Sequence, residues 1–282
     1  MKSDIMEAMH FFHASGSFPK GCNASFIALV LKVRDPSSLE QFRPISLVGA
    51  IYKIITKVLS GRMKKVLPMI IDECQSAFLS NRGLMDSVVM ANEVLEGIRR
   101  NRRSGVCFKV DFEKAYDSVR WSFLYDMLGR MGFHDKWIQW IKGCLVSSSV
   151  SVLVNGSLTE EFKPTRGLRQ GDPLAPFLFL VVAEGLSGLV RQALRKEVLR
   201  GVKVGRNEIE CCLLQFADDT LFLCEDSFSN IFAIKAILRC YEIVSGLKVN
   251  FHKSKVAGVN IDEYSLTTYA KTLNCNSMRL PF

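Results

Sequence analysis

The stretch FADDTLFLC, Phe216–Cys224, places two adjacent aspartates inside an otherwise apolar run. Neighbouring carboxylates repel each other, and apolar surroundings make their charge unfavourable. Apolar runs over 209–216 and 220–224 flank this pair, a pattern typical of a β-hairpin whose tip carries both Asp218 and Asp219. Such a tip favours a hard divalent cation, which removes the repulsion. The pair alone equally fits an ordinary turn, in which aspartate is common.

The composition indicates a folded, basic protein. Hydrophobic residues make up 48% of the 282 residues, enough to fill a core, which argues against wholesale disorder. The formal net charge of +9 favours an anionic partner, and nucleic acid is the commonest one. Many basic proteins simply carry solvated lysines, so charge alone leaves both interpretations open. The cysteines show no Cys-x-x-Cys spacing, which favours reduced, mostly buried thiols over a zinc site.

Apolar periodicity and turn residues predict a mixed α and β order along the chain. This order suits one sheet with helices packed on one face. The most apolar run is about half a membrane span, so we expect a buried helix there and no membrane partner. The expected elements are helices over 51–66, ended by Pro68, and 84–98, a strand over 106–112, a helix capped by Asp117 or Ser118, a hairpin at Asn155-Gly156, the buried helix over 174–183, the aspartate hairpin, a helix over 229–244 and a strand within 245–256.

A third acid would make a two-metal site feasible, and Asp111 is the candidate. It lies in the expected strand over 106–112, which could neighbour the aspartate hairpin. Two metal ions suit in-line displacement at phosphorus, because one activates the attacking oxygen and the other stabilises the leaving group. Mg²⁺ is the natural ion, with Mn²⁺ as a substitute, because it accepts a few carboxylates together with phosphate oxygens.

Six segments together resemble the reverse transcriptases of non-LTR, LINE-type retroelements, especially those of plants. Each segment is a weak match by itself, but six in the expected order are specific. The resemblance runs over nearly the whole chain, from about residue 16 to 282. The segments are FRPISL (Phe42–Leu47), QSAFLSNRGLMDSV (Gln75–Val88), KVDFEKAYDSV (Lys109–Val119), GLRQGDPLAPFLF (Gly167–Phe179), FADD (Phe216–Asp219) and SGLKVNFHKSK (Ser245–Lys255).

The resemblance implies an α+β fold of reverse-transcriptase fingers and palm, in which a ferredoxin-like palm sheet packs with helices. It implies a thumb that is absent from this chain, together with the endonuclease that usually precedes the domain. The implied division is 1–25 as an N-terminal lead-in, 26–105 as part of the fingers, 106–275 as the palm with inserted fingers-side elements, and 276–282 as the truncated start of the primer-grip region.

The resemblance also implies roles at the matching positions. Asp111, Asp218 and Asp219 would be the catalytic acids and metal ligands, with Asp219 more a support than a ligand. The backbone carbonyl of Phe112 would face a metal. Tyr116 would lie beside the sugar of the incoming nucleotide, where its ring would clash with a ribose 2′-hydroxyl and so favour deoxynucleotides. The alternative for Tyr116 is a core residue of the palm.

Other matching positions imply contacts to nucleotides. Gln170 and Gly171 would form the turn that packs against the nascent base pair. Arg166 and Arg169 would add positive charge for phosphates. Asp172 would be structural, ahead of the helix that follows Pro173.

Further basic residues are implied in the fingers and the late palm. Arg43 and Arg82 would grip the triphosphate or the template backbone, although a surface or structural role fits each nearly as well. Lys253 resembles the lysine that protonates departing pyrophosphate, and Lys255 is a close rival.

These implications describe an RNA-directed DNA polymerase that uses Mg²⁺, an RNA template, a DNA primer and dNTPs. Nuclear action would fit a retroelement, but the chain carries no convincing localisation signal, so its localisation is unknown. One alternative is an inactive, truncated relic that at most binds nucleic acid through its basic surface. Another is a different palm enzyme, such as a viral RNA-templated RNA polymerase or a nucleotidyl cyclase, which Tyr116 and the RQGDP segment disfavour.

Overall fold

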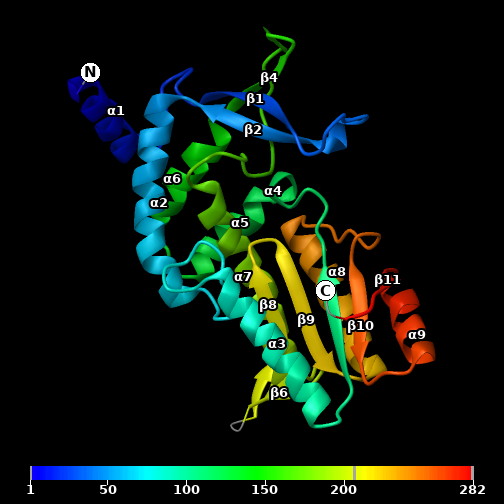
Figure 1. Ribbon diagram of the computed structural model, residues 1–282. Helices are drawn as coiled ribbons and strands as arrows, with labels where there is room; N and C mark the ends of the chain where they lie inside the picture. The colour runs from blue at the N-terminus through cyan, green and yellow to red at the C-terminus, as the bar shows by residue number, and fades with distance from the viewer. Residues whose placement is uncertain (1, 206–207, 281–282) are drawn as a thin grey trace. The chain divides into compact units, whose positions relative to one another are not determined.

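The computed structural model describes residues 2–205 and 208–280, and the chain divides into two compact units (Figure 1). The first unit holds residues up to 66 and residues 119–179, and the second holds 67–118 and the chain from 180 onward. Two long helices, α2 (Ala50–Ile70) and α7 (Ala175–Arg195), run from one unit into the other.

These units do not follow the expected domain boundaries. Residues 67–105, expected with the fingers, belong to the second unit. The reason is that helix α3 (Leu84–Arg100) packs on strands of that unit and contributes Val94, Leu95 and Ile98 to its core. Pro281 and Phe282, the last residues of the expected primer-grip region, lie outside the described residues.

The first unit contains a four-stranded sheet of order β2-β1-β4-β5. Strand β1 is antiparallel to β2 and parallel to β4. The expected hairpin at Asn155-Gly156 is confirmed, because both residues have positive φ as a type I′ turn requires. Because this sheet is separate from the sheet of the second unit, the expectation of a single sheet is wrong. The elements are α1 (Lys2–Ser15), β1 (Ala24–Leu31), η1 (Leu39–Gln41), β2 (Phe42–Val48), α5 (Trp121–Arg130), α6 (Asp135–Val146), β4 (Ser149–Val154) and β5 (Ser157–Leu158).

The second unit contains a five-stranded sheet of order β11-β10-β3-β9-β8 and a separate β6-β7 pair. The aspartate hairpin is confirmed as β8 and β9, and the expected helix over 229–244 is confirmed as α8. The remaining elements are β3 (Gly105–Val110), α4 (Ala115–Ser118), β6 (Val202–Val204), β7 (Ile209–Cys211), β8 (Leu213–Phe216), β9 (Asp219–Glu225), α8 (Phe228–Ser245), β10 (Lys255–Val259), α9 (Glu263–Leu273) and β11 (Asn276–Ser277).

Helices cover both faces of this second sheet, so the expectation of one covered face is wrong. Successive side chains of a strand point to opposite faces, and Val106, Cys107 and Phe108 on β3 are all buried. Figure 1 shows α3 crossing the strands, and Cys107 belongs to the core beneath that helix. On α8, the Tyr241 hydroxyl donates to the carbonyl of Val182 on α7 at 3.0 Å.

Two expected helix ends are wrong. Helix α2 continues past Pro68 to Ile70, because a proline in the last turn disturbs few hydrogen bonds. Asp117 lies inside the short helix α4, and the next helix, α5, begins after Arg120 without a side-chain cap.

Helix α7 carries the most apolar run of the chain. By length and composition it is the one helix among the described residues that could cross a membrane, a test that the core helix of a soluble protein also passes. Its residues Val181, Val182 and Leu186 are buried. This burial agrees with the expected buried helix.

An ion triad ties the loop after α2 to α7 within the second unit. Arg191 donates through Nη2 to Glu184 Oε1 at 2.7 Å and through Nη1 to the carboxylate of Asp72. Glu184 Oε2 in turn accepts from the Asp72 amide at 2.9 Å. Burial acts to raise the pKa of Asp72, but the Cys74 amide and Arg191 together hold it below its ordinary value.

We predict that Arg191→Met destabilises the chain by about 2–3 kcal/mol in urea unfolding at pH 7. Breaking a buried ion pair costs about 3–5 kcal/mol, and solvent reduces this because Arg191 is 43% exposed. The lowered pKa of Asp72 means that its stabilisation is present above the unfolded pKa of about 3.9 and is lost as pH falls through the folded value.

The difference in unfolding free energy between Arg191→Met and the wild type should therefore become smaller at acid pH. The control is Arg99→Met, which removes an exposed pair with Glu96 and should change stability by less than about 0.5 kcal/mol. Equal unfolding midpoints for Arg191→Met and Arg99→Met at pH 7 would contradict the role of the triad.

Candidate active site

Strand register in the second unit brings the three acids together. Strands β3 and β9 are antiparallel, and their register ends with Val110 opposite Thr220, so Asp111, which follows β3, and Asp219, which begins β9, lie at the same end of the two strands. Asp218 precedes Asp219 in the two-residue loop between β8 and β9. The acids thus lie at one end of two adjacent strands, as the sequence predicted.

The carboxylates interact electrostatically. Partial burial, together with the charges of Asp219 and Asp111, raises the pKa of Asp218 above its ordinary value. Burial and the charge of Asp219 also raise the pKa of Asp111, while Lys253 and Lys109 act in the opposite direction. Both acids therefore gain more from a bound cation than isolated carboxylates would.

The carboxylates of these acids suit a hard cation, but by themselves they supply only part of its coordination shell. Across residues 2–205 and 208–280, no three acidic, histidine or cysteine side chains are grouped closely enough to hold a metal by themselves. Mg²⁺ does not require such a group, because it is usually bound by one or two carboxylates together with water and substrate phosphates. Asp111 and Asp218 supply two carboxylates of this kind.

The main chain of Phe112 is oriented towards the acids. Phe112 forms an antiparallel bridge with Val249, but the hydrogen bonds of that bridge belong to the flanking residues. Glu113 donates to Lys248 and Asn250 donates to Asp111, each at 2.8 Å. The carbonyl of Phe112 therefore points away from this strand and towards β9. The contact of this carbonyl with a metal stays a prediction.

The turn before β10 holds the backbone of Asp111. The amide of Asp111 donates to Ser254 Oγ at 3.1 Å, and the amide of Asn250 donates to the Asp111 carbonyl at 2.8 Å. Lys253 lies in the same turn, and its charge lowers the pKa of Asp111. Lys255 instead begins β10 opposite Lys109. Of the two lysines, Lys253 is the one whose charge affects the pKa of Asp111.

Tyr116 lies on α4 and is half-buried near the aspartate hairpin. Burial and the charge of Asp218 raise the pKa of Tyr116 to about 12. The phenol is therefore neutral at physiological pH. The sugar contact expected of Tyr116 stays a prediction.

The guanidinium of Arg82 donates to main-chain carbonyls. Its Nη1 donates to the carbonyls of Asp72 and Gln75 at 2.6 and 3.0 Å, and its Nη2 donates to those of Pro68 and Ile71, both at 3.1 Å. These bonds satisfy carbonyls at and beyond the C-terminus of α2, where a cation is also favoured by the helix dipole. These bonds favour the structural role for Arg82, which the sequence left open beside phosphate binding.

Gln170, Gly171 and Arg43 belong to the first unit. The carbonyl of Gln170 accepts from the Ser46 amide at 2.7 Å, which docks the turn onto β2. Gly171 has φ +98°, and a Cβ there would lie 3.0 Å from the Ser46 carbonyl oxygen. This position therefore requires glycine. Arg43 is exposed on β2 opposite Val30.

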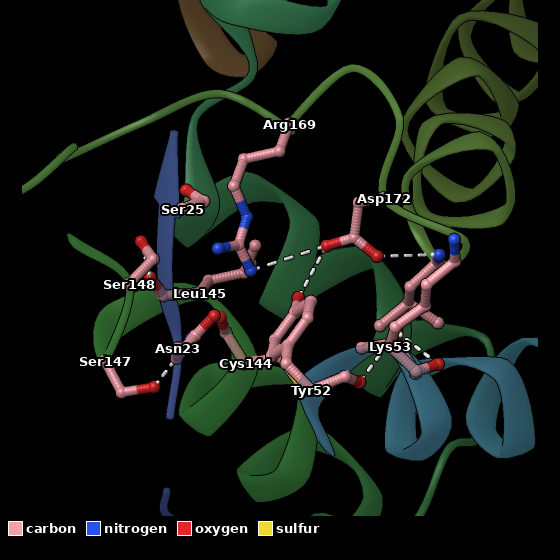
Figure 2. Close-up of polar contacts among 12 residues, drawn as sticks. Asn23, Ser25, Tyr52, Lys53, Cys144, Leu145, Ser147, Ser148, Arg169 and Asp172 are labelled. Atoms are coloured by element: carbon pink, nitrogen blue, oxygen red, sulfur yellow. Dashed lines mark hydrogen bonds and ion pairs between the residues drawn. The ribbon is translucent and has the colours of Figure 1, made fainter. Parts of the chain in front are cut away.

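Figure 2 shows a buried polar cluster behind that turn. The Tyr52 hydroxyl donates to Asp172 Oδ2 at 2.5 Å, and the Arg169 guanidinium lies 3.5 Å from the same oxygen and 4.3 Å from the Tyr52 ring centre. Asp172 Oδ1 accepts from the Leu174 amide at 2.9 Å. Arg169 is thus buried in the fold, which corrects its expected role as a phosphate contact, while Asp172 is structural as expected.

Comparison with known proteins identifies the fold and the family. The profile of the reverse transcriptase (RNA-dependent DNA polymerase) family matches residues 32–268. The uncharacterized 149 kDa protein of transposon TX1 from Xenopus laevis is 29% identical over 242 residues, which are 85% of this chain and 18% of that protein. The Pol polyprotein of the type-2 retrotransposable element R2DM from Drosophila melanogaster is 27% identical over 255 residues, 90% and 23% of the two chains.

Among solved structures, telomerase from Candida tropicalis, in complex with a fragment of telomeric RNA, matches with a TM-score of 0.59 at 13% identity. The match covers 91% of this chain and 44% of that one, and it supports the fold alone. The chain belongs to the reverse transcriptase family, and the expected α+β fold of fingers and palm is confirmed.

The relatives are proteins of non-LTR retrotransposons, as the six segments predicted. The chain spans less than a quarter of the length of these two relatives. Reverse transcriptase domains generally depend on a divalent metal. The frog and fly relatives leave the plant origin a prediction.

We predict that Arg82→Lys destabilises the chain by about 1.5–3 kcal/mol, since hydrogen bonds to a charged group are worth that much and an ammonium cannot replace the planar fork. Urea unfolding measures the change. The exposed Arg100→Lys on α3 is the control and should be nearly neutral. Loss of nucleic-acid affinity in Arg82→Lys with an unchanged unfolding midpoint would restore the phosphate-binding assignment.

Proposed function

We propose that this chain is an RNA-directed DNA polymerase domain that adds dNMP units to the 3′-hydroxyl of a DNA primer on an RNA template. The observation that carries the proposal is the placement of Asp111, Asp218 and Asp219 at one end of paired strands in a reverse transcriptase fold. Clustered carboxylates in a chain of formal net charge +9 suit a substrate that arrives as a polyanion with its cations.

In this proposal Asp111 and Asp218 would hold two Mg²⁺ ions, and the Phe112 carbonyl would be a further oxygen ligand. The chemistry supplied by the bound ions is activation of the primer 3′-hydroxyl and stabilisation of the leaving pyrophosphate. Asp219 supports the hairpin and adds negative charge. Lys253, which already acts on Asp111 electrostatically, donates a proton to the departing pyrophosphate.

The remaining residues select and orient the substrates. Tyr116 presents its ring to the sugar of the incoming nucleotide and excludes a 2′-hydroxyl. Gln170 and Gly171 pack against the nascent base pair, where the absence of a side chain at Gly171 allows close approach. Arg43, exposed on β2, contacts the template backbone or the triphosphate.

We predict that Asp218→Asn lowers dNTP incorporation on a poly(rA)/oligo(dT) duplex by on the order of 10³-fold, because several kcal/mol of transition-state stabilisation depend on the bound ions. The variant should nevertheless unfold at a higher temperature in EDTA at pH 7. The raised pKa of Asp218 means that its ionised form destabilises the folded chain above its unfolded pKa, and this repulsion disappears in the amide.

Asp126→Asn, in an exposed helical pair with Arg130, is the matched control and should keep full incorporation. Wild-type incorporation in Asp218→Asn would contradict the assignment. A wild-type chain that binds the duplex in a salt-sensitive manner but extends no primer, with Mg²⁺ present, would instead support the relic alternative.

We predict that Tyr116→Ala reduces the preference for dTTP over UTP by about 10- to 100-fold, because the ring no longer clashes with the 2′-hydroxyl. The ratio of kcat/KM values for the two nucleotides measures this preference. Tyr264→Ala, at an exposed tyrosine of α9, should leave the ratio unchanged. An unchanged ratio in Tyr116→Ala would show that Tyr116 is only a core residue.

A further inference from the structure

One buried glutamine holds the loop that carries Asp218. Gln75, which is 1% exposed, accepts through Oε1 from the amide of Ala217 at 3.0 Å and donates through Nε2 to the carbonyl of Ala217 at 3.4 Å. The same Oε1 accepts from the amide of Ala77 at 3.0 Å. The side-chain amide of Gln75 is therefore hydrogen-bonded to both the amide and the carbonyl of Ala217, the residue immediately before Asp218.

The hydrogen bonds from Gln75 hold Ala217, whose backbone conformation is unfavourable. Ala217 is the first of two loop residues and has φ +55°, a left-handed conformation that turns of this kind usually assign to glycine. A residue with a Cβ persists there only where its surroundings over-determine the backbone. Any relaxation of Ala217 rotates the peptide that leads into Asp218 and moves its carboxylate.

The backbone around Gln75 is itself held in place. Residues 74–76 run alongside β8, with a parallel bridge between Gln75 and Gln215. The amide of Gln215 donates to the Cys74 carbonyl at 2.7 Å, and the amide of Ser76 donates to the Gln215 carbonyl at 3.0 Å. Gln75 thus lies in a short segment that main-chain hydrogen bonds hold beside β8, and its side chain reaches the loop from there.

We propose that Gln75 is a positioning residue of the polymerase site, which keeps Ala217 left-handed and thereby sets Asp218 in the orientation that binds the divalent cation. The proposal rests on the proposed function. It gives a specific task to a buried polar side chain that contacts no proposed substrate group. Buried hydrogen bonds suit this task because they are directional.

The chain offers a closely matched control. Gln215 is also a buried glutamine, 2% exposed, on the strand beside Gln75. Its side-chain Oε1 accepts from Ser187 Oγ at 3.0 Å and from Cys74 Sγ at 3.8 Å, and its other bonds to residues 74–76 are made by its main chain. None of these bonds reaches Ala217. Substituting each glutamine by methionine removes an equally buried amide, but only Gln75→Met releases the loop.

The test compares Gln75→Met, Gln215→Met, Ala217→Gly and the double variant Gln75→Met/Ala217→Gly in the full chain. Mn²⁺ affinity is measured by electron paramagnetic resonance, and kcat and the primer–template KM by dTTP incorporation. Gln75→Met should weaken Mn²⁺ binding and kcat by about 10- to 100-fold, the usual loss for a residue that orients a ligand, with the primer–template KM unchanged. Gln215→Met should retain both within about threefold.

Rescue distinguishes positioning from general destabilisation. Glycine adopts φ +55° without the Cβ penalty, so Ala217→Gly should restore most of the Mn²⁺ affinity that Gln75→Met loses. Equal losses in Gln75→Met and Gln215→Met, or no recovery in the double variant, would overturn the proposal.

Hydrogen exchange over residues 216–219 reports on the loop without any catalysis. Faster exchange in Gln75→Met, but not in Gln215→Met, is expected, because the Ala217 amide loses its acceptor. A wild-type chain that incorporates no nucleotide would contradict the proposed function, whereas unchanged exchange in Gln75→Met would overturn the role of Gln75 alone.

Discussion

Repulsion among the carboxylates of Asp111, Asp218 and Asp219 is the constraint on which the second unit depends. Three acids stay together only if the main chain beneath them cannot yield. Paired strands supply that rigidity, since β3 and β9 cannot separate without breaking the sheet. The short separation of the acids makes their ionised forms unfavourable when no cation is bound. The same short separation gives them affinity for a cation, so stability and function place opposite demands on this site.

Support for this cluster comes from buried polar groups far away in the sequence. Ser254 holds the amide of Asp111 across 143 residues, and Gln75 holds Ala217 across 142 residues. The ion triad of Asp72, Glu184 and Arg191 anchors the segment that leads to Gln75. Because hydrogen bonds are directional, this arrangement sets the geometry of the acids more closely than apolar packing would.

Local features of the fold could be predicted because their causes are local. The hairpin at Asn155-Gly156 follows from two residues that tolerate positive φ, and helix α3 follows from apolar spacing. The separate four-stranded sheet of the first unit was not predicted, because it pairs β1 with β4 more than a hundred residues later. The coverage of both sheet faces also depends on which helices return to the sheet.

The roles of the arginines show the same limit within the site. A sequence shows that Arg82 and Arg169 carry donors, but it does not show where the acceptors lie. Arg82 finds four carbonyls around the end of α2, and Arg169 finds Asp172 and the face of Tyr52. A guanidinium bound in this way is a structural element, whatever segment it occupies.

By itself, the sequence determined the family, the order of its segments and the identity of the acids at the hairpin tip, because these depend on residue types and short spacings. Only the tertiary structure decided that Asp111 lies at the same end of paired strands as Asp219, that the charge of Lys253 affects the pKa of Asp111, and that Gln75 hydrogen-bonds the loop before Asp218. These last features depend on contacts between distant segments. The role of a buried donor or acceptor is set only when the folded chain brings its partner within hydrogen-bonding distance.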